Sequence, residues 1–336
     1  MSESGTGSPA PGVRLSYGFG TDRGLRRELN EDSFLAADPL FAVADGMGGH
    51  EAGEVASREC IQTLSSQSVL AAGSREATAA QLHQALQQAD SRIRELTNAR
   101  AGTTVSGVVL VEERGVPYWL VFNVGDSRTY RLSQGSFAQV SVDHSEVQEL
   151  VDGSFITPAE ALIHPRRHVV TRALGTGSDT EADFWLVPVE EGDRIMVCSD
   201  GLSGELSDEQ IHRTLGTLRH PQDAVDSLIQ SALRSGGRDN VTVVVVDASN
   251  VSGNHGEETL NTAQLPTTEA ADTLPRMVQD PEAPPASRPA VPEEVLESIP
   301  DFVRNPGGGA GEVPPAAQEP AEQANVAAPL HKENHG

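Results

Sequence analysis

Four aspartates stand where apolar segments of the chain begin or end, a position from which a strand can deliver a carboxylate to the rim of a site. Asp45 ends an apolar run and precedes Gly46-Met47-Gly48-Gly49, and Asp126, Asp200 and Asp239 occupy comparable positions further along. A single Asp-Gly pair is most often a solvated turn. Four such positions in one chain favour a shared chemical site.

The chemistry that four carboxylates support is the binding of hard divalent cations. Oxygen ligands without histidine or cysteine partners select Mg²⁺ or Mn²⁺ and argue against zinc. Carboxylates that converge on one point repel each other strongly unless cations neutralise them. Gly46, Gly48 and Gly49 lack a Cβ, so the backbone beside Asp45 can turn sharply and bring a carbonyl close to a bound ion.

Composition divides the 336 residues into one folded domain and two biased ends. From Ser249 onward the chain holds 13 of its 21 prolines, with 14 acidic and 4 basic residues. Such a segment cannot offset the entropy of ordering, so residues 249–336 are predicted to be a disordered tail, and residues 1–12 likewise. Residues 13–248 have the right length for one large domain with a substantial core.

Charge and cysteine content exclude several classes of protein. Residues 1–248 carry 20 basic and 35 acidic residues, whereas nucleic-acid binding requires a basic surface. Cys60 and Cys198 are too few for a disulfide framework and lie in apolar segments, which favours a reducing compartment. The sequence shows neither an apolar run long enough to span a bilayer nor a signal peptide. We therefore expect a cytoplasmic protein that binds neither nucleic acid nor membrane.

Apolar periodicity predicts layers of strands covered by helices. Helices are expected at about 51–64 and 77–98, and two more begin at the capping box of Ser207 and at Pro221. The second helix should bury Leu82, Leu86, Ala89, Ile93 and Leu96. Residues 144–168 contain two prolines and no sustained period, so an irregular or partly helical excursion is expected there. Strands are expected at 17–21, 34–36, 41–44, 103–111, 116–124, 128–132, 137–142, 185–189, 194–199 and 241–246.

Seven short motifs, in order, resemble the metal-dependent Ser/Thr protein phosphatases called PP2C or PPM, and most closely their bacterial branch. The resemblance covers residues 13–248 and implies an α+β fold, a four-layer α-β-β-α sandwich of two antiparallel sheets flanked by helices. Residues 144–168 correspond to a flap beside the site. The motifs are Arg27-Glu28-Leu29-Asn30-Glu31-Asp32, Val43-Ala44-Asp45-Gly46-Met47-Gly48-Gly49, Ala101-Gly102-Thr103-Thr104, Asn123-Val124-Gly125-Asp126-Ser127-Arg128, Thr171-Arg172-Ala173-Leu174-Gly175, Cys198-Ser199-Asp200-Gly201 and Gly237-Arg238-Asp239-Asn240.

The resemblance also implies a set of metal ligands. Asp45 would bridge two Mn²⁺ or Mg²⁺ ions, the Gly46 carbonyl would bind one of them, and Asp200 and Asp239 would complete the pair. Asp126 would join Asp200 at a third, weaker cation. Two cations about 4 Å apart lower the pKa of a bridging water, so that hydroxide can attack phosphorus in line.

The same resemblance assigns roles around the metal ligands. Arg27 would hold the phosphate, since its planar fork donates two parallel hydrogen bonds. Arg27, Asp45 and Asp239 form the expected catalytic set. Glu31 and Asp32 would position metal-bound water, and Asn240 would contact the metal ligands without binding the ions. The implied activity is hydrolysis of phosphoserine and phosphothreonine in proteins, by a monomer that opposes a Ser/Thr kinase in bacterial signalling.

One position departs from the family's pattern. Many eukaryotic relatives have a histidine, credited with protonating the leaving alkoxide, where this chain has Met47. Methionine cannot donate a proton. The general acid is then either a metal-bound water or His50, three residues on.

Three other interpretations are weighed against this one. A cysteine phosphatase needs an arginine six positions after the nucleophile, where Cys60 has Ser66 and Cys198 has Gly204. A catalytically dead binding module would lack a metal carboxylate, and none is missing. A regulator dedicated to one partner is not separated from a general phosphatase by sequence. In the tail, apolar residues at helical spacing within 295–303 suggest docking to a partner such as the cognate kinase, the alternative being an inert linker.

Overall fold

The computed structural model describes residues 12–48, 52–177 and 181–251. The chain divides into two units, residues 1–283 and 284–336, and every described residue belongs to the first. Most of the predicted disordered ends, together with Gly49 and His50, therefore lie outside the described residues. The domain boundaries stay predictions.

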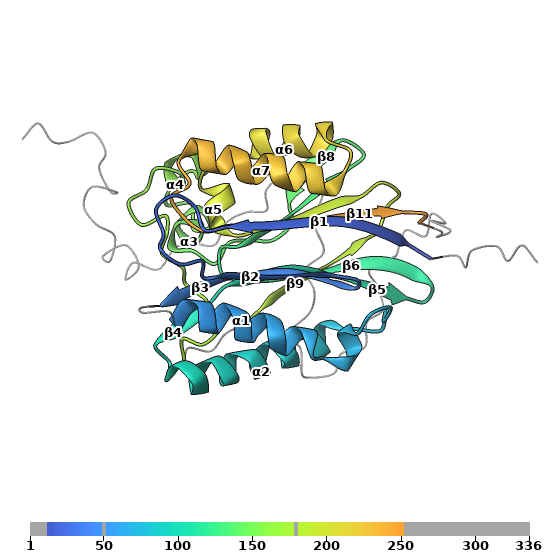
Figure 1. The fold of residues 1–336 in the computed structure, drawn as a ribbon, viewed down its shortest axis with the longest axis horizontal. Helices are drawn as coiled ribbons and strands as arrows, with labels where there is room; N and C mark the ends of the chain where they lie inside the picture. The colour runs from blue at the N-terminus through green and yellow to red at the C-terminus, as the bar shows by residue number, and fades with distance from the viewer. Residues whose placement is uncertain (1–11, 49–51, 178–180, 252–336) are drawn as a thin grey trace, which may run out of the picture. The chain divides into compact units, whose positions relative to one another are not determined.

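Two antiparallel sheets face each other and form the two inner layers of the domain (Figure 1). One sheet has the strand order β1-β11-β10-β7-β8, and the other has the order β2-β3-β5-β6-β9 with β4 paired to β3. Their bounds are β1 Arg14–Asp22, β2 Asp32–Ala37, β3 Leu40–Gly48, β4 Ala101–Thr103, β5 Val105–Glu113, β6 Val116–Val124, β7 Arg128–Ser133, β8 Ser136–Gln139, β9 Asp183–Pro188, β10 Arg194–Cys198 and β11 Val241–Ser249.

Helices cover the outer face of each sheet and complete the four layers that the sequence predicted (Figure 1). α1 (Ala52–Ser65) and α2 (Ala79–Thr97) pack below the sheet that contains β3, with the short 3-10 helix η1 (Ser68–Leu70) between them in sequence. α6 (Asp208–Thr217) and α7 (Pro221–Ser235) cover the sheet that contains β11. α5 (Asp200–Ser203) is a single turn directly after β10.

The core follows from the alternation of side chains along each strand. In β11, Val243 and Val245 face the cluster beneath α5, α6 and α7, while Val244 and Val246 face the opposite sheet. Successive strand residues point to opposite faces, so a continuous valine run suits a strand that is buried on both sides. Between the sheets, Phe41 and Trp119 are fully buried. This packing fixes the strands whose ends carry the aspartates.

Helix ends follow the predicted capping chemistry. At α6, Ser207 Oγ accepts the Gln210 amide, and Gln210 Oε1 accepts the Ser207 amide at 2.9 Å. α7 begins with Pro221 as expected. One burial prediction for α2 was wrong: Leu96 is 56% exposed, because the last turn of α2 buries Thr97 instead.

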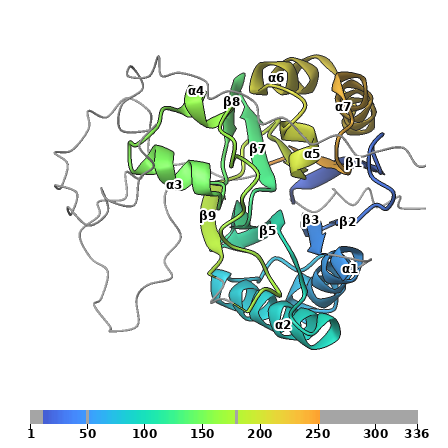
Figure 2. The same ribbon diagram turned by 90° about the vertical axis from the view of Figure 1, so that its left-hand side faces the viewer.

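The predicted excursion at 144–168 contains two short helices, α3 (Glu146–Asp152) and α4 (Pro158–Ala161). Figure 2 shows both standing to one side of the two sheets. The segment is held at its base, where the Thr171 amide donates to the His144 carbonyl at 2.8 Å. The Gly125 amide donates to His144 Nδ1 at 3.1 Å, which ties this base to the turn that carries Asp126.

Gly46 and Gly48 do not make the sharp turn expected from the sequence, and Gly49 lies outside the described residues. β3 continues through Asp45 to Gly48, and Gly46 and Gly48 pair with Thr103 and Ala101 of β4. Glycine at position 46 is required for close packing instead. A Cβ on Gly46 would lie 2.1 Å from the Gly53 carbonyl oxygen, at the start of α1. The expected turn is therefore absent at Gly46 and Gly48, although Gly46 does need to be a glycine.

Candidate metal centre

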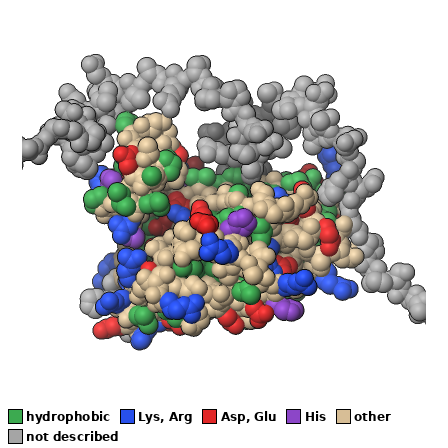
Figure 3. All heavy atoms as spheres, turned by 90° about the horizontal axis from the view of Figure 1, so that it is seen from above, with side chains coloured by type: hydrophobic (Ala, Val, Ile, Leu, Met, Phe, Trp, Pro, Cys, Tyr) green, Lys and Arg blue, Asp and Glu red, His purple; other side chains and the backbone are tan. Residues whose placement is uncertain are grey.

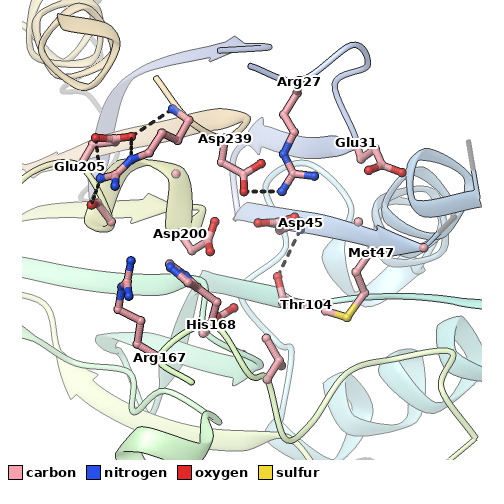
Figure 4. Close-up of a pocket in the computed structure, with 17 residues that line it drawn as sticks. Arg27, Glu31, Asp45, Met47, Thr104, Arg167, His168, Asp200, Glu205 and Asp239 are labelled. Atoms are coloured by element: carbon pink, nitrogen blue, oxygen red, sulfur yellow. Dashed lines mark hydrogen bonds and ion pairs between the residues drawn. The ribbon is translucent and has the colours of Figure 1, made fainter. Parts of the chain in front are cut away.

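One cavity of about 560 Å³ gathers the four predicted aspartates. Asp45 comes from β3, Asp126 from the turn after β6, Asp200 from the first residue of α5, and Asp239 from the loop before β11. Arg27, Glu31 and Gly46 also line this cavity. Figure 4 shows Asp45, Asp200 and Asp239 around it. Residues up to 212 positions apart in sequence, Arg27 and Asp239, thus share one site.

Hydrogen bonds to the neighbouring strand hold the backbone of Asp45. Its carbonyl accepts the Thr104 amide and the Thr103 hydroxyl, both at 2.9 Å, and its amide donates to Thr104 Oγ1 at 3.2 Å. The next amide, that of Gly46, donates to the Glu31 carbonyl at 3.1 Å. Because the backbone is fixed on both sides, the side chain of Asp45 has a fixed origin at the cavity wall.

Asp32 supports Asp45 from beneath the cavity. It lies opposite Asp45 in the register of β2 and β3, and it is almost fully buried. Its Oδ2 accepts the hydroxyls of Ser199, the residue between β10 and α5, at 2.8 Å and of Thr242 in β11 at 2.6 Å. Oδ1 of Asp32 is buried without a hydrogen-bond partner among the described residues.

Asn240 joins the segment 23–31 to the loop that carries Asp239. Its Oδ1 accepts the Glu31 amide at 2.8 Å, and its Nδ2 donates to the carbonyls of Arg23 and Leu29, both at 2.9 Å. All three hydrogen-bonding groups of this amide side chain are therefore used. The predicted supporting role of Asn240 has a geometric basis in these contacts.

Arg27 reaches into the cavity from a half-exposed position. Its Nη2 donates to Asp239 Oδ2 at 2.6 Å (Figure 4). Its Nε and Nη1 have no hydrogen-bond partner among the described residues. Nη2 keeps a second N–H, which together with Nε–H or with an Nη1–H can still offer a fork of donors to an anion.

The electrostatics of the carboxylates fit a cation site. Burial, followed by neighbouring carboxylates, raises the pKa of Asp45 well above its ordinary value, and it also raises the pKa of Asp200. The same causes raise the pKa of Asp126 to about 8, and burial is the main cause that raises the pKa of Asp32 to about 7. These neighbouring carboxyl groups resist ionisation, and a bound cation would stabilise their ionised forms.

Whether this cavity suits divalent cations depends on the chemistry of its donor atoms. Within residues 12–48, 52–177 and 181–251, no three His, Cys, Asp or Glu side chains form a ready-made cage for an ion. The carboxylates instead line an open cavity, and Asp200 Oδ1 is buried there without a hydrogen-bond partner. An unsatisfied carboxylate oxygen among hard oxygen donors suits Mg²⁺ or Mn²⁺. The residues present therefore fit the predicted cations.

Several cavity residues were not singled out by sequence reasoning. Arg167 and His168, from the excursion at 144–168, lie across the cavity from Arg27 (Figure 4). Glu205 and Arg238 form part of another wall. The histidines of the excursion were the only available signal, because no spacing pattern indicated which of them would reach the site. The candidate general acid His50 lies outside the described residues.

Comparison with known proteins identifies the family. A model of the protein phosphatase 2C family matches residues 20–235. The Ser/Thr protein phosphatase PstP of Mycobacterium tuberculosis is 42% identical over 240 residues, which cover 69% of this chain and 45% of that protein. The chain thus spans about half the length of this relative. The Ser/Thr phosphatase stp of Listeria monocytogenes is 34% identical over 241 residues, covering 68% of this chain and 94% of that protein.

Solved structures agree with the sequence comparison. The catalytic domain of PstP in complex with two manganese ions is 37% identical, with a TM-score of 0.64, and the match covers 71% of this chain and all of that domain. The PPM phosphatase MsPP of Mycobacterium smegmatis, in complex with cacodylate, is 39% identical with a TM-score of 0.63, over 69% of this chain and 97% of that one. With its two-sheet sandwich and its carboxylate-lined cavity, this chain belongs to the protein phosphatase 2C family.

Proposed function

We propose that this chain is a metal-dependent phosphatase that hydrolyses phosphoserine and phosphothreonine in proteins. The observation that carries the proposal is the convergence of Asp45, Asp126, Asp200 and Asp239 with Arg27 in one cavity of a protein phosphatase 2C fold. Two of the relatives are Ser/Thr protein phosphatases by name. Neither cysteine lines this cavity, so no thiol is available there for a cysteinyl-phosphate intermediate.

Asp45, Asp200, Asp239 and the Gly46 carbonyl would hold two divalent cations, Mn²⁺ or Mg²⁺, and Asp126 with Asp200 would hold a third, weaker one. When bound, such cations stabilise charge on phosphoryl oxygens and lower the pKa of water. Asp32, which Ser199 and Thr242 orient, lies opposite Asp45 in the strand pairing and keeps an unpartnered Oδ1. Glu31, held through its amide by Asn240, lines the cavity wall beside Arg27.

Arg27 would bind the phosphate of the substrate. Its bond to Asp239 holds the guanidinium at the cavity, and its free donors can take two phosphoryl oxygens in parallel. The negative charge that develops on these oxygens during hydrolysis is stabilised by donors that are already in place. Such preorganised electrostatic stabilisation is usually the largest single contribution to rate enhancement.

Protonation of the leaving alkoxide has a second candidate in addition to His50. His168 lines the cavity, faces Asp200 and lies on the side opposite Arg27 (Figure 4). Met47 also lines the cavity but carries no transferable proton. We therefore propose His168 as a proton donor for substrates whose leaving group is a serine or threonine alkoxide.

The cellular location and the partners of the proposed activity are inferred from general features of the chain. Among the residues that the structure describes, no helix is both long and apolar enough to cross a bilayer. Two free, buried cysteines suit a reducing compartment, so we propose a cytoplasmic site of action and a cognate Ser/Thr kinase as the opposing enzyme. Acidic and basic side chains are interspersed on the described part of the face shown in Figure 3, without a broad basic patch. We propose a monomer that dephosphorylates other proteins.

Hydrolysis of a panel of phosphoserine and phosphothreonine peptides by the full chain tests the proposal. We expect activity with Mn²⁺, no activity with excess chelator, and a fall in kcat of about 10²-fold or more for Arg27→Ala, since an oriented donor to the transition state is lost. Asp239→Asn should be at least as severe. Arg58→Ala, which breaks an exposed ion pair with Glu54 on α1, is the matched control and should leave kcat unchanged. Turnover that persists in chelator would overturn the proposal.

A further inference from the structure

Glu205 and Arg238 join the two segments that carry Asp200 and Asp239. Arg238 Nε donates to Glu205 Oε1 at 2.8 Å, and Nη2 donates to Oε2 at 3.1 Å. The backbone amide of Arg238 donates to the same Oε1 at 3.0 Å. One carboxylate therefore fixes both the side chain and the backbone of the residue that immediately precedes Asp239.

The Glu205–Arg238 contact has a buried carboxylate, although Arg238 itself is on the surface. The Glu205 side chain is only 3% exposed, whereas that of Arg238 is 64% exposed. Arg238 lowers the pKa of Glu205, chiefly through the side-chain hydrogen bond, so this carboxylate stays ionised. A Cβ on Gly236 would meet Glu205 Oε2 at 3.0 Å, which shows how closely the loop wraps the carboxylate.

The other end of α5 is pinned to the same loop. A Cβ on Gly201 would lie 1.9 Å from the Asn240 carbonyl oxygen, so the backbone of α5 touches the backbone after Asp239. Glu205 follows α5 and touches the backbone before Asp239. α5 carries Asp200 at its first residue. The two contacts thus bracket Asp239 on one segment and both follow Asp200 on the other, which fixes the two backbones relative to each other.

We propose that Glu205 is a positioning residue for the metal centre and that, through Arg238, it sets the separation of Asp200 and Asp239. This inference rests on the proposed function, because it concerns the same cations. Both residues line the cavity, but their charged groups are engaged with each other. The pair acts on the metal ligands through the backbone, in the way that outer contacts hold metal ligands in other proteins.

A purely electrostatic role for the pair makes the opposite prediction for Arg238. If charge alone mattered, removing the positive Arg238 side chain beside the acidic ligands would strengthen Mn²⁺ binding. If the pair instead positions the loop, removing Arg238 loosens the loop and weakens Mn²⁺ binding. Glu205→Gln separates the two roles again, because it removes the charge but keeps an oxygen that can accept the Arg238 amide.

Calorimetric titration of the full, metal-free chain with Mn²⁺ tests the proposal. We expect Glu205→Ala and Arg238→Ala to weaken Mn²⁺ binding by about 10-fold or more, the effect typical of lost support around metal ligands. Glu205→Gln should stay within about threefold of the unmodified chain, since its one oxygen can still accept both the Arg238 amide and Nε, and only the Nη2 bond to Oε2 is lost. At saturating Mn²⁺ the KM for a phosphopeptide should be unchanged, whereas a direct substrate contact of Arg238 would raise it.

Arg131→Ala is the matched control, because it breaks a bidentate pair with the buried Asp193 at the opposite end of β10. It should lower the melting temperature without changing Mn²⁺ affinity. Unchanged or tighter Mn²⁺ binding in Arg238→Ala would overturn the proposal, even if Glu205→Ala fails to fold. An unmodified chain that binds no Mn²⁺ would instead overturn the proposed function.

Discussion

At the scale of single residues, the proposed metal ligands and the proposed proton donor differ in how they are held. Arg27 and Asp239 are joined by a 2.6 Å contact, and Thr103 and Thr104 hold the backbone of Asp45. His168 is exposed and makes no hydrogen bond to a described residue. A proton donor has to reach the leaving oxygen and then be recharged from solvent, and exposure at the cavity wall allows both.

His168→Gln should therefore distinguish substrates by their leaving group. We expect kcat for a phosphoserine peptide to fall by about 10²-fold, since general acid catalysis contributes at least that much for a poor leaving group. Hydrolysis of an aryl phosphate, whose leaving group needs no proton, should change little. His164→Gln is the control on the same excursion, because His164 does not line the cavity. Equal losses on both substrates would show that His168 only supports the fold.

The four aspartates that line the cavity were predictable from sequence, whereas the Glu205–Arg238 contact was not. Each aspartate lies near the end of a recognisable apolar run, and motif resemblance proposed these residues as metal ligands. Glu205 and Arg238 meet across 33 positions with no spacing signal. Asn240 was predicted to support the site, but its contact with the carbonyl of Leu29, 211 positions away, was not. Such contacts arise from the packing of segments, which periodicity does not encode.

At the scale of elements, β3 and α5 show where prediction from local sequence fails. The sequence rule that glycine marks a turn failed at Gly46, because tertiary packing against Gly53 uses the missing Cβ within a strand. α5 was not predicted at all, since four residues are too short to show a period. The long helices were predictable because each buries one face that shows a helical period in the sequence. The valine-rich β11 was predictable because a continuous apolar run marks a strand that is buried on both faces.

Gly46→Ala should cost about 1–3 kcal/mol of unfolding free energy, since an added methyl group is overpacked against fixed backbone. Urea denaturation of the metal-free protein measures this loss. Gly216→Ala, on an open part of α6, is the control and should be neutral or stabilising by up to about 1 kcal/mol. A Gly46→Ala variant as stable as the unmodified chain would mean that α1 can move away from β3 at no cost.

At the scale of the whole molecule, the acidic cavity makes stability depend on pH and on metal. Asp32 and Asp126 have pKa values raised to about 7 and about 8, and the pKa of Asp45 and Asp200 is raised as well. A carboxyl whose pKa is higher in the folded state binds its proton more tightly there than in the unfolded chain. Its contribution to stability is complete below its unfolded pKa and is lost as pH rises through the folded pKa.

The metal-free protein should therefore melt at lower temperature at pH 8 than at pH 5. We expect a fall of at least about 2–4 °C, the shift that one kcal/mol produces in a domain of this size. Added Mn²⁺ should raise the melting temperature more at pH 8 than at pH 5, because protons compete with metal for the carboxylates. Differential scanning calorimetry with chelator or with Mn²⁺ measures both. A melting temperature that rises with pH in chelator would contradict the role assigned to these carboxylates.

The pairing of β1 with β11 determines how this domain can be attached to anything else. Arg14 lies opposite Ser249, so the chain enters and leaves the sandwich side by side. Val241, two residues after Asp239, is separated from Ser249 by eight residues of extended strand, or about 27 Å. A surface, a reporter protein or a second domain joined next to Arg14 or Ser249 would be attached at the strand ends remote from the aspartate-lined cavity. The proposed phosphoprotein substrates could then reach that cavity while the domain stays tethered.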